Sequence, residues 1–143
     1  MKAHPWENRK LTKSYGKPLE IVQYFCYNTL MSCIFCRIVK KELNSSLIFE
    51  NERIVAFRDV NPQAPVHILI IPKKHIAGLN DITPEDNLVL GEIQNIAREL
   101  AKKENIDGDG YRLVVNCGSA AGQAVAHLHY HLLGGRTFSW PPG

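Results

Sequence analysis

The chain has 143 residues, of which 45% are hydrophobic and 22% are charged, and these values are typical of one globular domain with its own buried core. No apolar run approaches the roughly 20 residues that a membrane-spanning helix needs, so we expect no membrane segment. The net charge of +3 does not predict binding to a specific nucleic acid, because the basic excess lies in the first 30 residues and the remainder is neutral.

The first 31 residues differ from the rest of the chain. They are basic and have no helical or strand period, so we expect a disordered or non-native extension before a domain over residues 32–143. Met31 could be the translation start, and an organelle-targeting segment is the alternative. The four cysteines form no secreted disulfide framework. We therefore expect a cytoplasmic protein, or an organellar one if the extension is a targeting segment.

Apolar periodicity predicts an α+β domain. Helical spacing indicates a short helix over residues 33–41 and a long one that starts at Thr83 and Pro84 and ends near Glu104. Alternating or continuous apolar residues predict five strands, over residues 46–50, 53–60, 66–71, 111–116 and 125–133. Hairpin-type connections then favour a mainly antiparallel sheet with one long and one short helix.

Three histidines alternate with apolar residues in the last predicted strand. His127, His129 and His131 would therefore project from one face of the sheet. Three titratable groups in a row usually converge on a phosphate, a metal or a nucleophilic relay. The central imidazole, His129, could attack phosphorus directly, and the flanking histidines could supply charge or a proton.

Two further features suggest chemistry. The glycine-bearing loop over residues 118–123 leads into the histidines, and Asn116 and Gln123 are uncharged donors suited to a phosphate. Cys33 and Cys36 form a C-x-x-C pair, which indicates metal binding or redox chemistry in an intracellular protein. A redox pair is disfavoured because no thioredoxin-like βαβ pattern surrounds it. His75, Cys26 and Cys117 are expected to be a surface histidine and ordinary thiols.

The segment HLHYHLL at residues 127–133 resembles the signature of the histidine triad (HIT) superfamily. Further segments resemble its Hint branch: residues 34–38, 56–59, 62–67, 71–76, 115–116, 122–123, 134–136 and 140–143. The resemblance covers about residues 32–143 and implies a HIT-like fold. It also implies a homodimeric purine nucleoside phosphoramidase, which cleaves the P–N bond of adenosine 5′-phosphoramidates or AMP-lysine adducts and releases AMP.

The same resemblance implies residue roles. His129 would be the nucleophile that becomes nucleotidylated, and His131 would contact the α-phosphate, with His127 beside them. Asp59 would accept hydrogen bonds from the ribose hydroxyls. The phosphate would lie near Asn116, Gly122 and Gln123. The purine pocket would be walled by Ile34, Phe35, Ile38, Phe57 and Val60, although plain core packing is the alternative for each. Trp140 would reach toward the active site of the partner subunit.

Two positions depart from the Hint pattern. Ala124 stands where the family has serine, so one hydroxyl donor is lost, and one such donor can be worth about 1–3 kcal/mol. A slower enzyme is therefore expected. Arg58 stands where histidine is common and could alter the rim of the pocket.

Several members of the superfamily bind zinc through a C-x-x-C pair. The resemblance implies Cys33, Cys36, His67 and His127 as ligands of a structural zinc that braces the histidine strand, and no cofactor is required for the chemistry. Two buried free thiols are the alternative.

Other functions stay open. A Fhit-like dinucleoside polyphosphate hydrolase shares the triad, but the Trp140–Gly143 tail and the 62–65 loop argue against it. A galactose-1-phosphate uridylyltransferase-like role is disfavoured, because that branch has glutamine where His131 stands. A non-catalytic, zinc-braced nucleotide-binding scaffold is the third alternative, because Ala124 lacks the hydroxyl of the family's serine.

Overall fold

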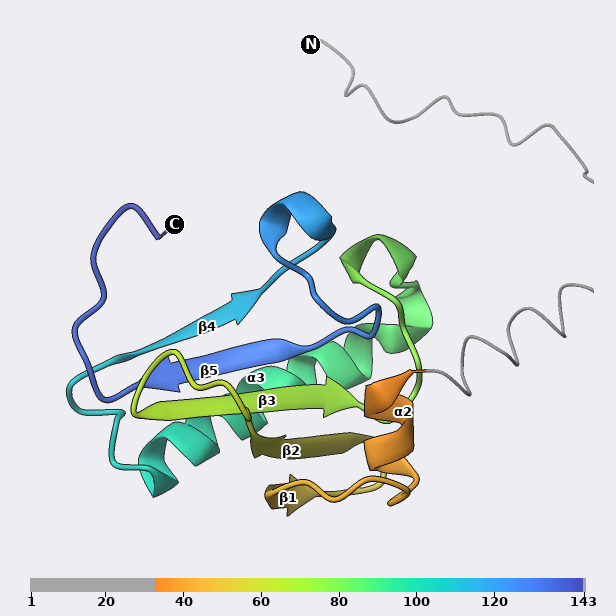
Figure 1. Ribbon diagram of the computed structural model, residues 1–143, viewed down its shortest axis with the longest axis horizontal. Coiled ribbons are helices and arrows are strands. Elements are labelled where there is room, and N and C mark those ends of the chain that lie inside the picture. The colour runs from red at the N-terminus through yellow and green to blue at the C-terminus, as the bar shows by residue number, and fades with distance from the viewer. Residues whose placement is uncertain (1–32, 143) are drawn as a thin grey trace, which may run out of the picture.

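The computed structural model describes residues 33–142. The expected N-terminal extension and Cys26 lie outside the described residues. Within residues 33–142, five strands form one antiparallel sheet in the order β1-β2-β3-β5-β4 (Figure 1). The strands are β1 (Leu47–Glu50), β2 (Ile54–Arg58), β3 (Val66–Pro72), β4 (Tyr111–Val115) and β5 (Tyr130–Gly134). The helices of the same segment are α2 (Ile34–Val39) and α3 (Asn87–Lys103). The α+β class and the mainly antiparallel sheet are confirmed.

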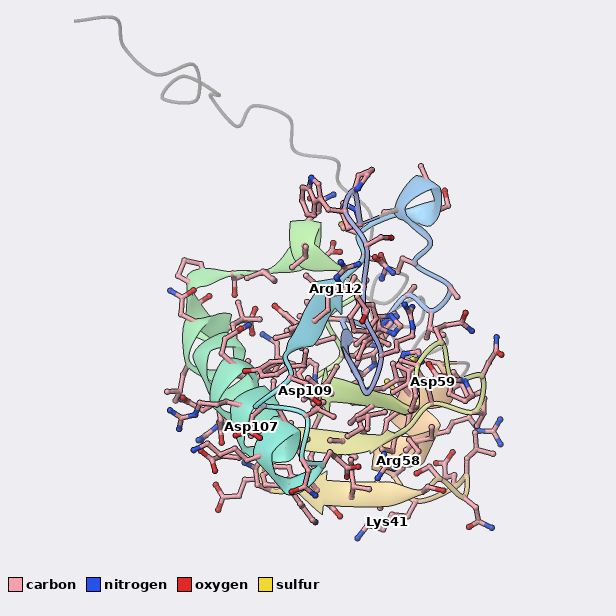
Figure 2. The ribbon with its side chains drawn as sticks, turned by 90° about the vertical axis from the view of Figure 1, so that its left-hand side faces the viewer. Lys41, Arg58, Asp59, Asp107, Asp109 and Arg112 are labelled. Carbon is pink, nitrogen blue, oxygen red and sulfur yellow. The ribbon has the colours of Figure 1, made fainter. Side chains whose placement is uncertain are left out.

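Helix α3 covers one face of the sheet. The buried side of α3 includes Ile93, Ala97 and Leu100, which pack in one cluster with sheet residues such as Ile54 and Ile70. Figure 2 views the sheet from one side and shows α3 on one face and Asp59 on the other. The alternating apolar residues that predict the strands are thus the ones whose side chains face α3.

The start of α3 is preceded by a short 3₁₀ turn over Pro84–Asp86. Asp86 accepts hydrogen bonds from the Thr83 backbone N–H at 3.0 Å and the Thr83 hydroxyl at 3.1 Å. Lys74 lies 2.6 Å from the other carboxylate oxygen of Asp86. Thr83 and Pro84 therefore mark the start of the helical segment as predicted, and the α-helix itself begins at Asn87.

Helix α2 packs on the opposite face. Its buried residues Phe35, Cys36 and Ile38 form a second apolar cluster with sheet residues such as Phe57 and Leu69. Ile38 is thus buried in the same cluster as Phe35 and Phe57. The site residues discussed below lie on this same face.

The last strand is shorter than expected. The prediction of a strand from residue 125 is wrong at its start, because pairing with β3 begins only at the Ile70–Tyr130 pair. Two pairs further, that register would place Pro72 opposite Leu128, and proline has no N–H for the ladder. The Leu128 N–H instead donates to the Ile76 carbonyl at 2.6 Å. None of the helices in residues 33–142 is long and apolar enough to cross a membrane.

Candidate active site and metal centre

The three histidines line up on the α2 face, even though two of them precede the regular strand. The intervening residues Leu128, Tyr130 and Leu132 are buried in the α3 cluster. The imidazole rings of His129 and His131 lie 5.0 Å apart, centre to centre. His127 is 0% exposed and His129 is 4% exposed, so both rings are withdrawn from water.

His129 is held in one tautomer by the backbone. Its Nδ1 lies 2.6 Å from the His127 carbonyl oxygen. Since a carbonyl only accepts, Nδ1 carries the proton and Nε2 keeps a lone pair. The Phe35 ring packs against this imidazole with its edge, at 5.3 Å between ring centres. A fixed imidazole with a free Nε2 is the arrangement that a nitrogen nucleophile needs.

His131 contacts a histidine from the neighbouring strand. Its Nδ1 lies 2.9 Å from Nε2 of His67, and the Asp59 carboxylate lies 3.3 Å from the same Nε2. Burial lowers the pKa of His131 to about 4, and the neighbouring His129 and His67 act in the same direction against a weaker opposing effect of Asp59. Burial also lowers the pKa of His67. Both rings are therefore neutral near pH 7.

The two thiols of the C-x-x-C pair lie beside His127 and His75. His127 Nδ1 is 3.5 Å from the Cys33 sulfur and 3.6 Å from the Cys36 sulfur, and His75 Nδ1 is 3.2 Å from the latter. The ligand atoms of these four residues all lie within 4.8 Å of one another.

His67, which sequence reasoning placed in this group, is elsewhere, and His75, expected at the surface, takes its place. His67 lies near the start of β3 and contacts His131. At about 3.3 Å per residue, five residues of strand separate it by roughly 16 Å from Pro72, whose carbonyl contacts His127. His75 follows that end of β3 directly. The two histidines differ only in which end of β3 they are near. The local sequence therefore does not indicate which of them joins the cysteines.

The residues of the cysteine–histidine cluster fit zinc. His127 Nε2 donates to the Pro72 carbonyl at 2.8 Å, which leaves the Nδ1 lone pair facing the thiols. Tetrahedral zinc, with bonds of about 2.3 Å to sulfur and 2.0 Å to nitrogen, sets neighbouring ligand atoms roughly 3.3–3.8 Å apart, close to the distances here. Burial, followed by the nearby Cys33, raises the pKa of the Cys36 thiol to about 12. A bound metal would therefore have to displace that proton.

A second group, Asp59, His67 and His131, also lies within 4.8 Å but does not fit a metal. The Gln63 backbone N–H donates to His67 Nδ1 at 3.0 Å. A neutral imidazole that accepts at Nδ1 must carry its proton on Nε2, so His67 has no lone pair for a metal in this group.

Comparisons with known proteins agree with this geometry. A family model described as "Scavenger mRNA decapping enzyme C-term binding" matches residues 32–139. An uncharacterized HIT-like protein of Synechocystis is 51% identical over 110 residues, which cover 77% of this chain and 96% of the relative. The chain belongs to the HIT-like family.

Two further comparisons concern the fold and the metal. The crystal structure of a HIT family hydrolase from Legionella pneumophila is 51% identical, has a TM-score of 0.77, and covers 78% of this chain and 100% of that one. The α+β HIT fold is thereby confirmed. A "14 kDa zinc-binding protein" of Zea mays is 48% identical over 112 residues, which cover 77% of this chain and 87% of that protein.

The expected nucleotide-binding residues are only partly gathered around the HIT histidines. Phe35 and Phe57 are buried and pack edge to face at 5.6 Å between ring centres. Ile34 lies on α2 and is half exposed. Val60 is 100% exposed, so it packs on none of the other expected wall residues within one chain. Trp140 is 84% exposed.

The Gln123 side chain contacts backbone groups of its own and a neighbouring segment. Its amide N–H groups donate to the carbonyls of Ala77 at 2.7 Å and Val125 at 3.1 Å. Its amide oxygen accepts from the Gly118 N–H at 2.9 Å. The side chain therefore fastens the 118–123 loop to the segment after β3. In that loop Gly122 has a φ of 84°, which favours glycine, and its position lies next to the Asn116 amide.

Arg58 does not lie at the rim of the histidine face. On β2 it alternates with Phe57 and therefore points to the α3 side. Its guanidinium lies 2.7 Å from both carboxylate oxygens of Glu104, just beyond the end of α3. The departure from histidine at this position thus serves an ion pair between sheet and helix.

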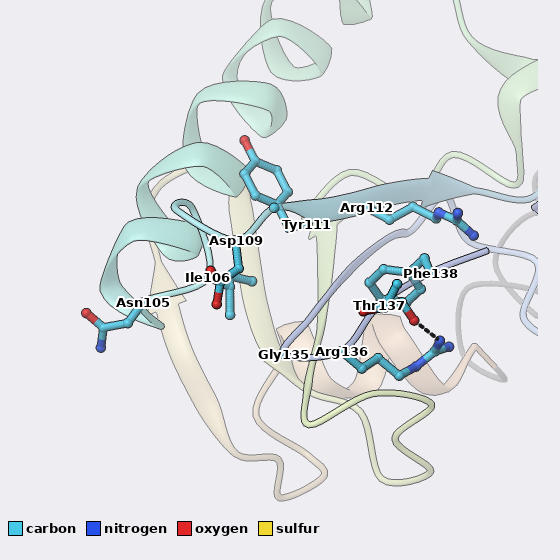
Figure 3. A pocket seen from close by; sticks show the side chains of 10 residues that line it. Asn105, Ile106, Asp109, Tyr111, Arg112, Gly135, Arg136, Thr137 and Phe138 are labelled. Carbon is cyan, nitrogen blue, oxygen red and sulfur yellow. Dashed lines mark hydrogen bonds between the residues drawn. The ribbon is translucent and has the colours of Figure 1, made fainter. Parts of the chain in front are cut away.

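A pocket of about 660 Å³ lies at the free edge of β4, away from the histidines (Figure 3). The Phe138 ring lies between the guanidinium carbons of Arg112 and Arg136, which are 4.9 and 4.2 Å from its centre. Both arginines already donate to backbone carbonyls, those of Ser139 and Gln63. Its lining contains no histidine or cysteine, so this pocket is separate from the histidine row and from the cysteine–histidine cluster.

Proposed function

We propose that this protein hydrolyses purine nucleoside phosphoramidates, such as adenosine 5′-phosphoramidate or AMP-lysine, to the nucleoside monophosphate. One observation carries the proposal: the 2.6 Å contact of His129 Nδ1 with the His127 carbonyl, which leaves Nε2 as a free nucleophile beside His131. Membership of the HIT-like family and the similarity to a HIT family hydrolase support it.

In the proposed reaction His129 acts twice. Its Nε2 lone pair attacks phosphorus, the P–N bond breaks, and the leaving nitrogen departs as an amine after taking a proton from water. The positive charge on the nucleotidylated ring is stabilised by the hydrogen bond from Nδ1 to the His127 carbonyl. Water then attacks phosphorus, the P–Nε2 bond breaks, and the proton of this water neutralises the hydroxide left by the first step. The monophosphate and the free imidazole are released. The low pKa of His131 makes it a neutral donor to a phosphate oxygen.

The remaining residues would bind the nucleotide. Asp59 would accept the ribose hydroxyls, and Asn116 would donate to the phosphate, while Gln123 holds the adjoining loop. Phe35 lies close enough to His129 to form the inner end of a purine pocket.

We further propose that the active protein is a homodimer. Val60 is an expected wall residue, and Trp140 is expected to reach toward the active site of the partner subunit. Both are largely exposed in the single chain and would need a second subunit to contribute to a pocket. Within residues 33–142, β4 is an edge strand of the sheet, with the pocket of Figure 3 beside it, and an edge strand can pair with a strand of a second chain.

We also propose that Cys33, Cys36, His75 and His127 hold a structural zinc. When bound, the metal would fix α2 against the segment that carries the nucleophile and would take no part in the reaction. A cytoplasmic location stays a prediction.

A fluorogenic adenosine 5′-phosphoramidate tests the function. We expect wild-type protein to release the amine and His129→Ala to release none while still binding AMP. Substantial hydrolysis by His129→Ala would contradict the assignment of the nucleophile. No release by a folded wild type that binds AMP would contradict the phosphoramidase activity.

The second candidate is a zinc-braced nucleotide-binding scaffold. Two features favour it: Ala124, whose side chain has no hydroxyl donor, and the cysteine–histidine cluster. This candidate predicts that wild type and His129→Ala bind AMP equally and that neither turns over phosphoramidates or dinucleoside polyphosphates.

A further inference from the structure

Two arginines beside the pocket at the edge of β4 differ from the other arginines of the domain. Arg112 lies on β4, and Arg136 follows β5. Within residues 33–142, neither guanidinium lies within ion-pair distance of a carboxylate. The other arginines of this segment are each paired with a glutamate: Arg37, Arg53, Arg58 and Arg98. The part of the chain that the structure describes therefore leaves the charges of Arg112 and Arg136 uncompensated.

The Phe138 ring holds these two guanidiniums close together. Their central carbons lie 4.9 and 4.2 Å from the centre of this ring. Contact with an aromatic ring stabilises each guanidinium, but two positive charges against one ring also repel each other. Because both charges are so near the same ring, a single anionic group at its edge can reach both. Such a group would replace the repulsion by attraction.

The two guanidiniums have more N–H groups than the described residues use. Arg112 donates from Nη2 to the Ser139 carbonyl at 2.9 Å. Arg136 donates from Nε to the Gln63 carbonyl and from Nη1 to the Thr137 carbonyl, each at 3.1 Å. Since a guanidinium has five N–H donors, both arginines keep donors for a further acceptor. The backbone contacts meanwhile fix where these donors lie.

The pocket beside the arginines has room for a ligand larger than one anionic group. Its volume of about 660 Å³ is in the range of small-molecule sites. Figure 3 shows Arg112, Phe138 and Arg136 at one end of the pocket and Asp109 at the other. Because the Asp109 carboxylate repels anions, an anionic group would bind at the arginine end. The uncharged part of the ligand would then extend toward Asp109.

We propose that this pocket is a second ligand site, separate from the histidine row, that binds the phosphate group of a phosphate monoester between Arg112 and Arg136. Guanidinium groups suit phosphate because their paired N–H groups match its oxygen atoms. Charge favours a phosphate monoester over a carboxylate. The monoester carries about −1.5 to −2 at pH 7 and so matches two arginines, whereas a carboxylate carries a single charge. The site is independent of the reaction proposed at His129.

NMR titration of the full-length protein with ribose 5-phosphate tests the site in whatever assembly the protein forms. We expect saturable shifts of the Nε–H signals of Arg112 and Arg136 and of the backbone N–H signals of Tyr111 and Thr137. Ribose, which lacks the phosphate, should shift none of them. Inorganic phosphate should bind more weakly, because it leaves the rest of the pocket empty. Shifts at His129 report binding at the proposed active site separately. The absence of saturable shifts at millimolar ribose 5-phosphate overturns the proposal, and so does equal or tighter binding of inorganic phosphate.

Arginine variants show whether the guanidiniums bind the phosphate. We expect Arg136→Gln to raise the Kd for ribose 5-phosphate about tenfold or more, since a charge-assisted hydrogen bond is lost, and Arg112→Gln to do the same. Arg98→Gln is the matched control, because Arg98 is exposed and pairs with Glu99. An unchanged Kd in folded Arg136→Gln overturns the proposal. If neither variant folds, wild-type shifts at Tyr111 without shifts of the arginine Nε–H signals overturn it.

Discussion

At the scale of single residues, backbone groups decide what each imidazole can do. The Pro72 carbonyl takes the Nε2–H of His127, the His127 carbonyl takes the Nδ1–H of His129, and the Gln63 N–H occupies Nδ1 of His67. Each contact leaves one defined nitrogen for chemistry: Nδ1 of His127 for a metal, Nε2 of His129 for attack, and Nε2–H of His67 for donation. Because backbone groups do not titrate, each contact selects the same tautomer whenever the ring is neutral.

Ala124 offers a direct test at this scale. The residue is exposed and adjoins the loop that Gln123 fastens, so a serine adds a hydroxyl without disturbing packing. We expect Ala124→Ser to raise kcat/KM for a phosphoramidate about twofold to tenfold, the value of one neutral donor of about 0.5–1.5 kcal/mol. Steady-state kinetics measure the change in kcat/KM. Ala126→Ser is the control, because Ala126 is also exposed. An unchanged or lower value would show that this hydroxyl is not needed here.

At the scale of elements, the apolar periodicity of the sequence predicts the helices and strands. It does not predict which side chains meet at each end of a strand. The strands and α3 were found because their apolar residues face one shared core. The early end of the β3–β5 ladder was missed because Pro72 interrupts it from the partner strand. The exchange of His67 for His75 in the metal group was missed for a related reason: His67 lies at the start of β3, and His75 follows its other end.

Helix α2 is the element most dependent on the proposed zinc. It has six residues, too few to be stable alone, and both thiols lie at its start. We expect Cys36→Ser or His75→Ala to lose zinc, measured as metal content per chain. Thermal unfolding should then occur roughly 10 °C lower, since zinc at 100 times its Kd contributes about 2.7 kcal/mol.

Cys117→Ser is the matched control, because this half-buried thiol lies outside the cluster and its loss should change neither quantity. Wild-type protein that binds no zinc after reduction would rule out the metal centre and favour two buried free thiols.

At the scale of the whole molecule, the main apolar core and the candidate active site lie on opposite faces of the sheet. One face buries an apolar cluster against α3, while the other carries histidines such as His67 and His127, whose pKa values are lowered by burial. Burying those groups costs stability whenever the unfolded chain can take up protons that the folded chain cannot. The site should therefore make the stability of the entire domain depend on pH.

We expect unfolding free energy to fall between pH 7 and pH 5. The pKa of His131 is about 4 in the folded protein against an ordinary 6.5, so in this window the unfolded chain binds the extra proton. The sign follows: stability is fully present above pH 6.5 and declines as pH falls toward 4. His131 alone should account for about 1–2 kcal/mol at pH 5, and the lowered pKa of His67 acts in the same direction. The carboxylates with lowered pKa values, such as Glu92, contribute only at more acidic pH.

Urea denaturation at pH 7 and pH 5 measures the difference in unfolding free energy. His131→Gln should reduce this difference even if that variant is less stable overall. A difference that is the same in wild type and His131→Gln would show that this ring is not held neutral by the fold.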